Sequence, residues 1–232
     1  MYILGMDTSG KMASVALYDE QAQCFLGQNA VRSVQTHSQV ILPLVERMLA
    51  DTGLTLEDIG GLAVAIGPGS YTGLRIGISA VQALSYGLQT PCAGVSTLAG
   101  LAWQNVIWRG TLCPVLWARK SLYYVGFYQS DGVTVTQLEP DTILEEAEIS
   151  QKVQQYGDPV LFCGDGVTAW QDAPYATLAS PATQLANGSG VCLAAAAASA
   201  WGEPETLKPA YLQPVKAEKD RRTILKKGLQ SE

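Results

Sequence analysis

The sequence predicts an α/β protein built from two related lobes, on the strength of three observations. Three extended segments at the N-terminus follow one another as a meander, and extended and helical patterns alternate after it. A weaker copy of this order begins near residue 108. The chain of 232 residues is also long enough to bury an ordinary core without a disulfide or a structural metal.

The first lobe shows the clearest pattern. A helix is expected after His37, because apolar residues recur at three and four positions up to Gly53, which is a typical helix stop. The strands expected in this lobe are 2–6, 13–18, 23–30, 62–66 and 92–95. The helices are 41–52, 74–88 and 97–106.

The second lobe is predicted less clearly and is expected to be truncated. Its expected strands are 112–118, 122–128, 133–138 and 160–163, and its helices are 142–154 and 191–201. Residues 172–190 are rich in Ala, Pro, Ser and Thr and read as a loop. We therefore divide the chain into a first lobe (1–107), a smaller second lobe (108–215) and a basic tail (216–232).

Charge is distributed unevenly along the chain. Only 16% of the residues are charged, against about 25% in a typical globular protein. The segment 59–108 contains a single charged residue, Arg75. The tail carries a net charge of +3 and residues 1–215 carry −9. Helices exposed on a monomer rarely lack charge to this extent, so the gap needs an explanation.

Histidine and cysteine usage excludes several classes of site. His37 is the only histidine, so a metal site with two or more imidazoles is excluded. The five cysteines form no Cys-x-x-Cys pair, and their odd number favours reduced thiols. The N-terminus has no basic leader, and no apolar run reaches 18 residues. We expect a soluble, cytoplasmic protein that does not bind membranes.

Two motifs could bind a phosphate, and each has a structural alternative. Asp7, Thr8 and Ser9 follow the first strand, where backbone amides and hydroxyls could face a phosphate, although a simple hairpin turn uses the same residues. They are weak cofactor-binding candidates. The segment 67–77 lies between a strand and a helix but lacks the Lys-Ser/Thr ending of a Walker loop. Its glycines fit a functional role and close helix packing equally well.

Five segments resemble the TsaB (YeaZ) family, in the family's order and across nearly the whole chain: residues 3–9, 37–43, 67–77, 94–98 and 209–212. The resemblance implies a two-lobed fold of the actin-like ATPase superfamily with ribonuclease-H-like lobes. It also implies a non-catalytic subunit that dimerises with TsaD, the enzyme that transfers threonylcarbamoyl to the adenosine beside the anticodon of tRNA. TsaE, tRNA, ATP and a metal would belong to the complex, and the isolated chain could be a homodimer.

Two positions depart from the family pattern. Trp117 stands where relatives commonly have Asp, and Gln213 stands where they often have Arg. A ligand or contact role of the second lobe is therefore not carried over from the family.

The charge-poor helices of the first lobe are the expected TsaD interface, because interface centres are depleted of charge. No catalytic or metal-binding residue is expected. The interface residues that we predict are Ile41, Val45, Met48, Leu49, Gly73, Leu74, Gly77, Ile78, Ala80 and Val81. Two other functions stay open: an autonomous enzyme of the superfamily, either a phosphotransferase or a metallopeptidase, and a nucleotide-binding regulatory module.

Overall fold

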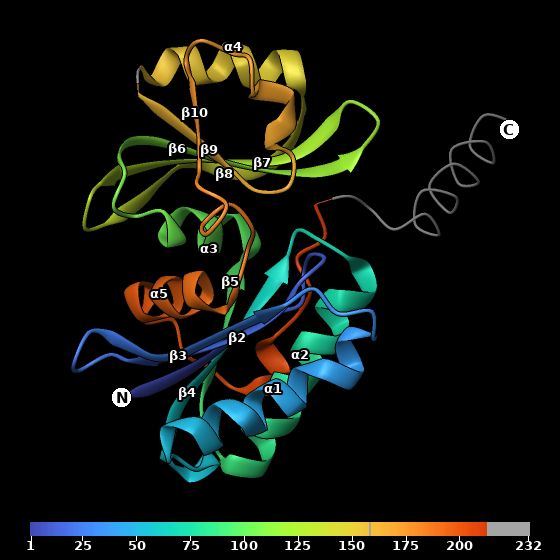
Figure 1. Ribbon diagram of the computed structural model, residues 1–232, viewed down its shortest axis with the longest axis vertical. Helices are drawn as coiled ribbons and strands as arrows, with labels where there is room; N and C mark the ends of the chain where they lie inside the picture. The colour runs from blue at the N-terminus through green and yellow to red at the C-terminus, as the bar shows by residue number, and fades with distance from the viewer. Residues whose placement is uncertain (158, 213–232) are drawn as a thin grey trace, which may run out of the picture.

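The computed structural model describes residues 1–157 and 159–212, so the predicted basic tail at 216–232 lies outside the described residues. The chain forms two five-stranded sheets, one above the other, with helices between them (Figure 1).

The first sheet has the strand order β3-β2-β1-β4-β5. β1, β2 and β3 pair antiparallel as the predicted meander, and β4 and β5 run parallel to β1. β1 and β2 are almost wholly buried because both of their faces are covered by helices. Its strands are β1 (Tyr2–Asp7), β2 (Ala13–Asp19), β3 (Cys24–Val31), β4 (Ile59–Gly67) and β5 (Cys92–Ser96).

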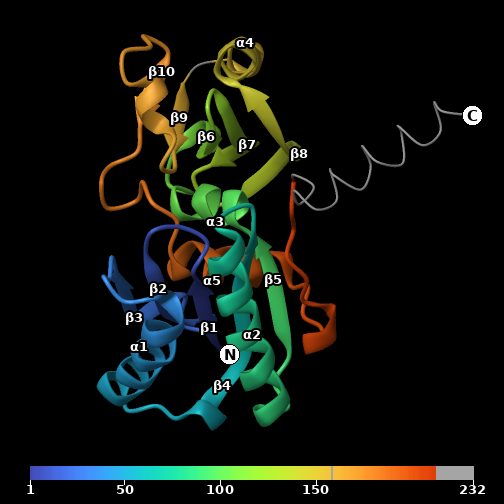
Figure 2. The ribbon, with the colours of Figure 1, turned by 90° about the vertical axis from the view of Figure 1, so that its right-hand side faces the viewer.

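Helices α1 (His37–Thr52) and α2 (Tyr71–Leu88) cover one face of the first sheet and contact each other (Figure 2). A short 3-10 turn, η1 (Leu56–Asp58), joins α1 to β4. α1 ends as predicted at Gly53, which adopts a left-handed conformation with φ 71° that glycine accepts readily. The apolar stripes of both helices pack into one core with β1, β2 and β4.

The second sheet has the strand order β10-β9-β6-β7-β8, which repeats the order of the first sheet. Three antiparallel strands are again followed by two parallel ones. The two sheets thus confirm two ribonuclease-H-like lobes. The elements of this lobe are β6 (Arg109–Arg119), β7 (Leu122–Asp131), β8 (Val135–Glu145), α4 (Glu146–Tyr156), β9 (Val160–Cys163), η2 (Val167–Trp170) and β10 (Ala176–Leu178).

The strand β10 lies inside the segment 172–190 that we expected to be a loop. It has only three residues and pairs with β9 alone, so its sequence carries little periodic signal. β8 also extends to Glu145, where the sequence predicted that a helix had already begun.

The C-terminal part of the chain returns to the first lobe. Helix α5 (Gly188–Ala198) packs on β1 and β2, and η3 (Pro204–Thr206) contacts α2. A side chain on Gly190 would collide with the backbone of Gly100 in α3 (Thr97–Gln104), so glycine permits α5 and α3 to approach closely. This arrangement differs from the predicted second lobe at 108–215, because the apolar face of α5 completes the core over the first sheet.

The two lobes are joined by a polar cluster around Asp141. Ser96, at the N-terminus of α3, donates a hydrogen bond to the Asp141 carboxylate on β8. The Tyr128 hydroxyl donates to Asp141 Oδ1 over 2.7 Å, and Gln137 Nε2 donates to the same atom over 3.0 Å. Burial raises the pKa of Asp141, and these hydrogen bonds oppose the rise. The cluster therefore ties the end of β5 to the second sheet.

Within the described part of the chain, every helix is too short or too polar to cross a membrane.

Candidate functional site

The structure corrects most of the predicted interface. Nine of the ten residues are buried in the first lobe itself, and only Ala80 is partly exposed. Leu74 and Val81 are fully buried, and Ile78 is 4% exposed. The residues that belong to this core instead of a free surface are Ile41, Val45, Met48, Leu49, Gly73, Leu74, Gly77, Ile78 and Val81.

The small-residue stripe of α2 also faces its own lobe. A side chain on Gly73 would collide with the carbonyl oxygen of Thr8, and one on Gly77 with the Thr8 hydroxyl. The Thr8 hydroxyl donates a hydrogen bond to the Gly73 carbonyl over 2.8 Å. The glycines therefore permit α2 to approach the turn after β1, and Gly73 and Gly77 leave no space for the partner helix that we predicted there.

Burial within the chain also accounts for much of the charge-poor segment. Residues 59–108 form β4, α2, β5 and α3, which include the buried inner strand β4 and the helix α3 that lies between the lobes. An ionised side chain is costly at such positions. The absence of charge is thus mainly a property of the core, and a partner surface has to be located on the exposed face of the helices.

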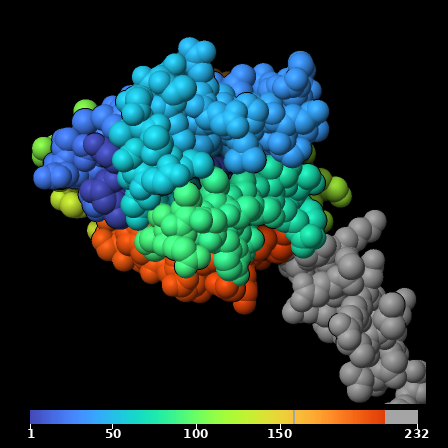
Figure 3. All heavy atoms as spheres, turned by 90° about the horizontal axis from the view of Figure 1, so that it is seen from below, coloured from blue at the N-terminus to red at the C-terminus, as the bar shows by residue number. Residues whose placement is uncertain are grey.

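That exposed face contains a groove of about 490 Å³ between α1 and α2. Figure 3 looks onto this end of the first lobe, where α1 (blue to cyan) and α2 (green) lie side by side. Leu42 and Tyr71 are 43% and 44% exposed, which is high for large apolar side chains. The residues that line the groove are Ser38, Ile41, Leu42, Tyr71, Thr72, Arg75, Ile76, Ser79 and Ala80.

An aromatic cluster closes one end of the groove. The guanidinium of Arg75 lies 4.5 Å from the centre of the Tyr71 ring, and its Nε donates to the Tyr211 hydroxyl over 3.2 Å. The rings of Tyr71 and Tyr211 stack with their centres 5.2 Å apart. The C-terminal segment is therefore anchored to α2 beside the groove, and Arg75 is held in place by two aromatic partners.

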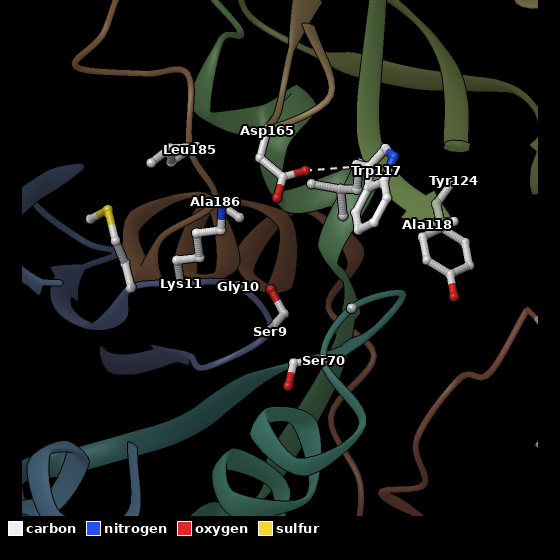
Figure 4. A pocket seen from close by; sticks show the side chains of 13 residues that line it. Ser9, Gly10, Lys11, Ser70, Trp117, Ala118, Tyr124, Asp165, Leu185 and Ala186 are labelled. Atoms are coloured by element: carbon white, nitrogen blue, oxygen red, sulfur yellow. Dashed lines mark hydrogen bonds between the residues drawn. The ribbon is translucent and has the colours of Figure 1, made fainter. Parts of the chain in front are cut away.

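A second hollow of about 440 Å³ lies between the lobes (Figure 4). The first lobe contributes the turn after β1 and the loop before α2, and the second lobe contributes the end of β6, part of β7 and the turn after β9. The lining residues are Ser9, Gly10, Lys11, Met12, Gly69, Ser70, Leu116, Trp117, Ala118, Tyr124, Asp165, Leu185 and Ala186.

Of the three weak cofactor candidates Asp7, Thr8 and Ser9, only Ser9 lines this hollow, and all three make hydrogen bonds within the protein. Asp7 is 2% exposed, and its Oδ1 accepts hydrogen bonds from the Ser9 amide and hydroxyl. Burial raises the pKa of Asp7, and the bonds from Ser9 oppose that rise. The hydroxyl of Thr8 is engaged with Gly73. These internal hydrogen bonds account for the geometry of the turn, as expected for the simple hairpin turn that was the structural alternative to phosphate binding.

The remaining candidate groups do not converge on one site. His37 is the first residue of α1, as expected for a helix start. Burial raises the pKa of the thiols of Cys113, Cys163 and Cys192, which keeps them protonated. Among residues 1–157 and 159–212, no three His, Cys, Asp or Glu side chains are grouped as a metal site would require.

Comparison with known proteins places the chain. A family model described as "TsaD: tRNA N6-adenosine threonylcarbamoyltransferase" matches residues 28–213. The tRNA threonylcarbamoyladenosine biosynthesis protein TsaB of Escherichia coli is 34% identical over 178 residues, which are 74% of each chain. The TsaB of Bacillus subtilis is 32% identical over 164 residues, or 71% of each chain. The chain belongs to the TsaB family.

A solved structure supports the family at the level of the fold. A Pseudomonas aeruginosa protein described as similar to peptidase YeaZ matches with a TM-score of 0.79 and 28% identity, over 91% of this chain and 99% of that one. The two-lobed α/β fold predicted from the sequence is therefore also the fold of this YeaZ-like structure.

Several residues of possible function were missed by the sequence reasoning. Leu42, Arg75 and Ile76 line the groove, but the periodic pattern drew attention only to the opposite, buried side of the same helices. Trp117 was noted only as a departure from the TsaB pattern, although it is 57% exposed and lines the hollow between the lobes.

Proposed function

We propose that this chain is a non-catalytic subunit for threonylcarbamoylation of the adenosine beside the anticodon of tRNA, and that it acts by binding the catalytic subunit TsaD. Membership of the TsaB family supports the pathway. The binding mode rests on one observation, the apolar groove between the exposed faces of α1 and α2.

The groove has the composition of an interface centre. Arg75 is the one charged residue among the residues that line it, and it is held by Tyr71 and Tyr211. Arginine and tyrosine are enriched at such centres, whereas lysine and acidic residues are depleted. A stable complex buries about 1,200–2,000 Å² in total, so the surrounding exposed faces of α1 and α2 would take part as well.

A catalytic role receives no comparable support. The polar groups of the turn after β1 are engaged in internal hydrogen bonds, and His37 lies at the start of α1, away from the hollow. In this proposal ATP, a metal ion and TsaE act in the complex with TsaD, and the tRNA substrate places the complex in the cytoplasm.

The test combines binding to TsaD with reconstituted tRNA modification. Ala80→Glu puts a charge into the groove, where burial in a complex would cost about 3 kcal/mol or more, a loss of affinity of roughly 100-fold. Ala147→Glu is the matched control, because Ala147 is exposed on α4 in the other lobe.

The Ala80→Glu chain should fold, fail to bind TsaD and fail to support modification, whereas Ala147→Glu should behave as wild type. Equal TsaD affinity for both variants would remove the groove from the interface. Transfer of threonylcarbamoyl by the purified chain without TsaD would end the non-catalytic proposal.

A further inference from the structure

Trp117 presents a large aromatic ring at the mouth of the hollow between the lobes. It is 57% exposed, and two hydrogen bonds fix it. Its backbone amide donates to Asp165 Oδ1 over 3.0 Å, and its indole Nε1 donates to the Lys120 carbonyl over 3.2 Å. The indole N–H points along the plane of the ring, so its hydrogen bond covers neither flat face, and the exposed part of the ring can take part in stacking.

Positive charge gathers around this ring although residues 1–215 carry a net charge of −9. Lys11 lines the hollow from the first lobe, opposite Trp117 and Asp165 (Figure 4). Arg119, the last residue of β6, and Lys120, in the turn that follows, are both exposed and lie two and three residues after Trp117. These three residues are a third of the nine lysines and arginines that precede residue 213.

Arg119 also acts on the lining of the hollow. Burial raises the pKa of the Tyr124 hydroxyl, and the positive charge of Arg119 opposes that rise. Arg119 is therefore within electrostatic reach of Tyr124, which lines the hollow beside Trp117. An incoming anionic group would meet Lys11 inside the hollow and Arg119 near its second-lobe wall.

A flat ring flanked by cations is typical of sites that bind single-stranded nucleic acid, where bases stack on aromatic side chains and the backbone follows basic residues. Asp165 adds a carboxylate next to the ring, whose second oxygen can accept a hydrogen bond from a base amino group or a ribose hydroxyl. The hollow of about 440 Å³ has the size of a pocket for one small ligand and is too small for a paired helix.

We propose that the mouth of this hollow binds an unpaired nucleotide of an RNA, with the base stacked on Trp117 and neighbouring phosphates held by Lys11, Arg119 and Lys120. The proposal rests on the proposed function, which supplies tRNA as the RNA. A polymer accounts for Arg119 and Lys120 better than a free nucleotide does, because both are exposed outside the hollow, where flanking phosphates would run. Asp165 also disfavours a concentrated triphosphate charge beside the ring.

The first experiment measures binding of the full chain to a labelled RNA stem-loop with an unpaired loop, by fluorescence anisotropy. Trp117→Ala should weaken binding about 5- to 100-fold, since one base stack is lost. Trp117→Phe keeps a ring and should retain most of the affinity. Tyr86→Ala is the control, because Tyr86 is 53% exposed on α2 and far from this turn in the sequence. A fully paired duplex of the same strand should bind more weakly than the stem-loop.

The second experiment tests the charges. Lys11→Gln and Lys120→Gln should each reduce the slope of log affinity against log salt by about 0.7, the value for one phosphate of a single strand. Lys208→Gln should leave the slope unchanged, because Lys208 is exposed in the C-terminal segment beyond α5. If Trp117→Ala melts well below wild type, the stem-loop binding assay uses Trp117→Leu in its place, since leucine keeps an apolar side chain without a ring.

Stem-loop affinity that is unchanged by loss of the ring would overturn the proposal. Displacement of the stem-loop by free AMP, with no affinity advantage for the RNA, would instead define a mononucleotide site and also contradict it. The proposed function fails separately, if the wild-type chain binds RNA through Trp117 but does not support modification by TsaD. If Trp117→Ala binds the stem-loop as tightly as wild type and the wild-type chain supports modification by TsaD, the RNA-site proposal is wrong and the proposed function still holds.

Discussion

Ile78 offers a direct way to separate the core of the first lobe from its proposed partner surface. It lies on α2, is 4% exposed and packs in the core with β1, β2, β4 and α1. Ile78→Ala removes three carbon groups, which at about 0.8 kcal/mol each gives a loss of about 2.4 kcal/mol in transfer free energy. The unfilled cavity adds to this, so the free energy of unfolding should fall by about 2–5 kcal/mol.

The assay is thermal and urea denaturation of the isolated chain, followed by circular dichroism. At about 2–4 °C per kcal/mol for a chain of this size, Ile78→Ala should melt at least roughly 5 °C below wild type. Ser79→Ala is the control, because Ser79 is the next residue on the same helix and is exposed. Its unfolding free energy should stay within about 0.5 kcal/mol of wild type. An Ile78→Ala chain that melts with wild type but loses binding to TsaD would refute the assignment of this stripe to the core.

Three further predictions follow from single contacts. Gly77→Ala should lower the free energy of unfolding by about 1–3 kcal/mol in urea denaturation, because its Cβ meets the Thr8 hydroxyl; an unchanged midpoint would mean that α2 can move away without cost. Asp141 has a raised pKa in the folded state, so the folded protein binds the extra proton, and the part of the stability that depends on Asp141 should fall as pH rises from about 4 through that pKa. Asp141→Asn should remove this part of the pH dependence, and identical pH profiles for the two proteins would contradict it. His37→Ala should melt close to wild type and support modification by TsaD, since His37 only begins α1; loss of modification in a folded chain would assign it a functional role.

The order of the elements was predictable from local signals. The meander, the two parallel strands and the stop of α1 at Gly53 all depend on short-range periodicity and on backbone conformations that favour glycine. The short strand β10 was missed because three residues carry no usable period. The return of α5 to the first lobe was missed because an alanine-rich helix does not reveal which sheet it covers.

The candidate site was only partly predictable, for a physical reason. The stripe of Leu74, Ile78 and Val81 was correctly identified as apolar, but burial in a core and burial in an interface require the same side-chain chemistry. Periodicity therefore located α2 as important and could not say which face was free. Trp117 could be recognised as unusual in the sequence, yet its exposure depends on the packing of two lobes.

The most direct test of the proposed function is the mass of the chain mixed with its own TsaD, measured by size-exclusion chromatography with light scattering. Wild type and Ala147→Glu are each expected to elute with TsaD as one heterodimer, and Ala80→Glu and TsaD are expected to elute separately. The chain alone gives the reference mass, whether monomer or homodimer. Separate elution of wild type and TsaD, or a heterodimer that forms equally well with Ala80→Glu, would contradict a subunit that works through the groove between α1 and α2.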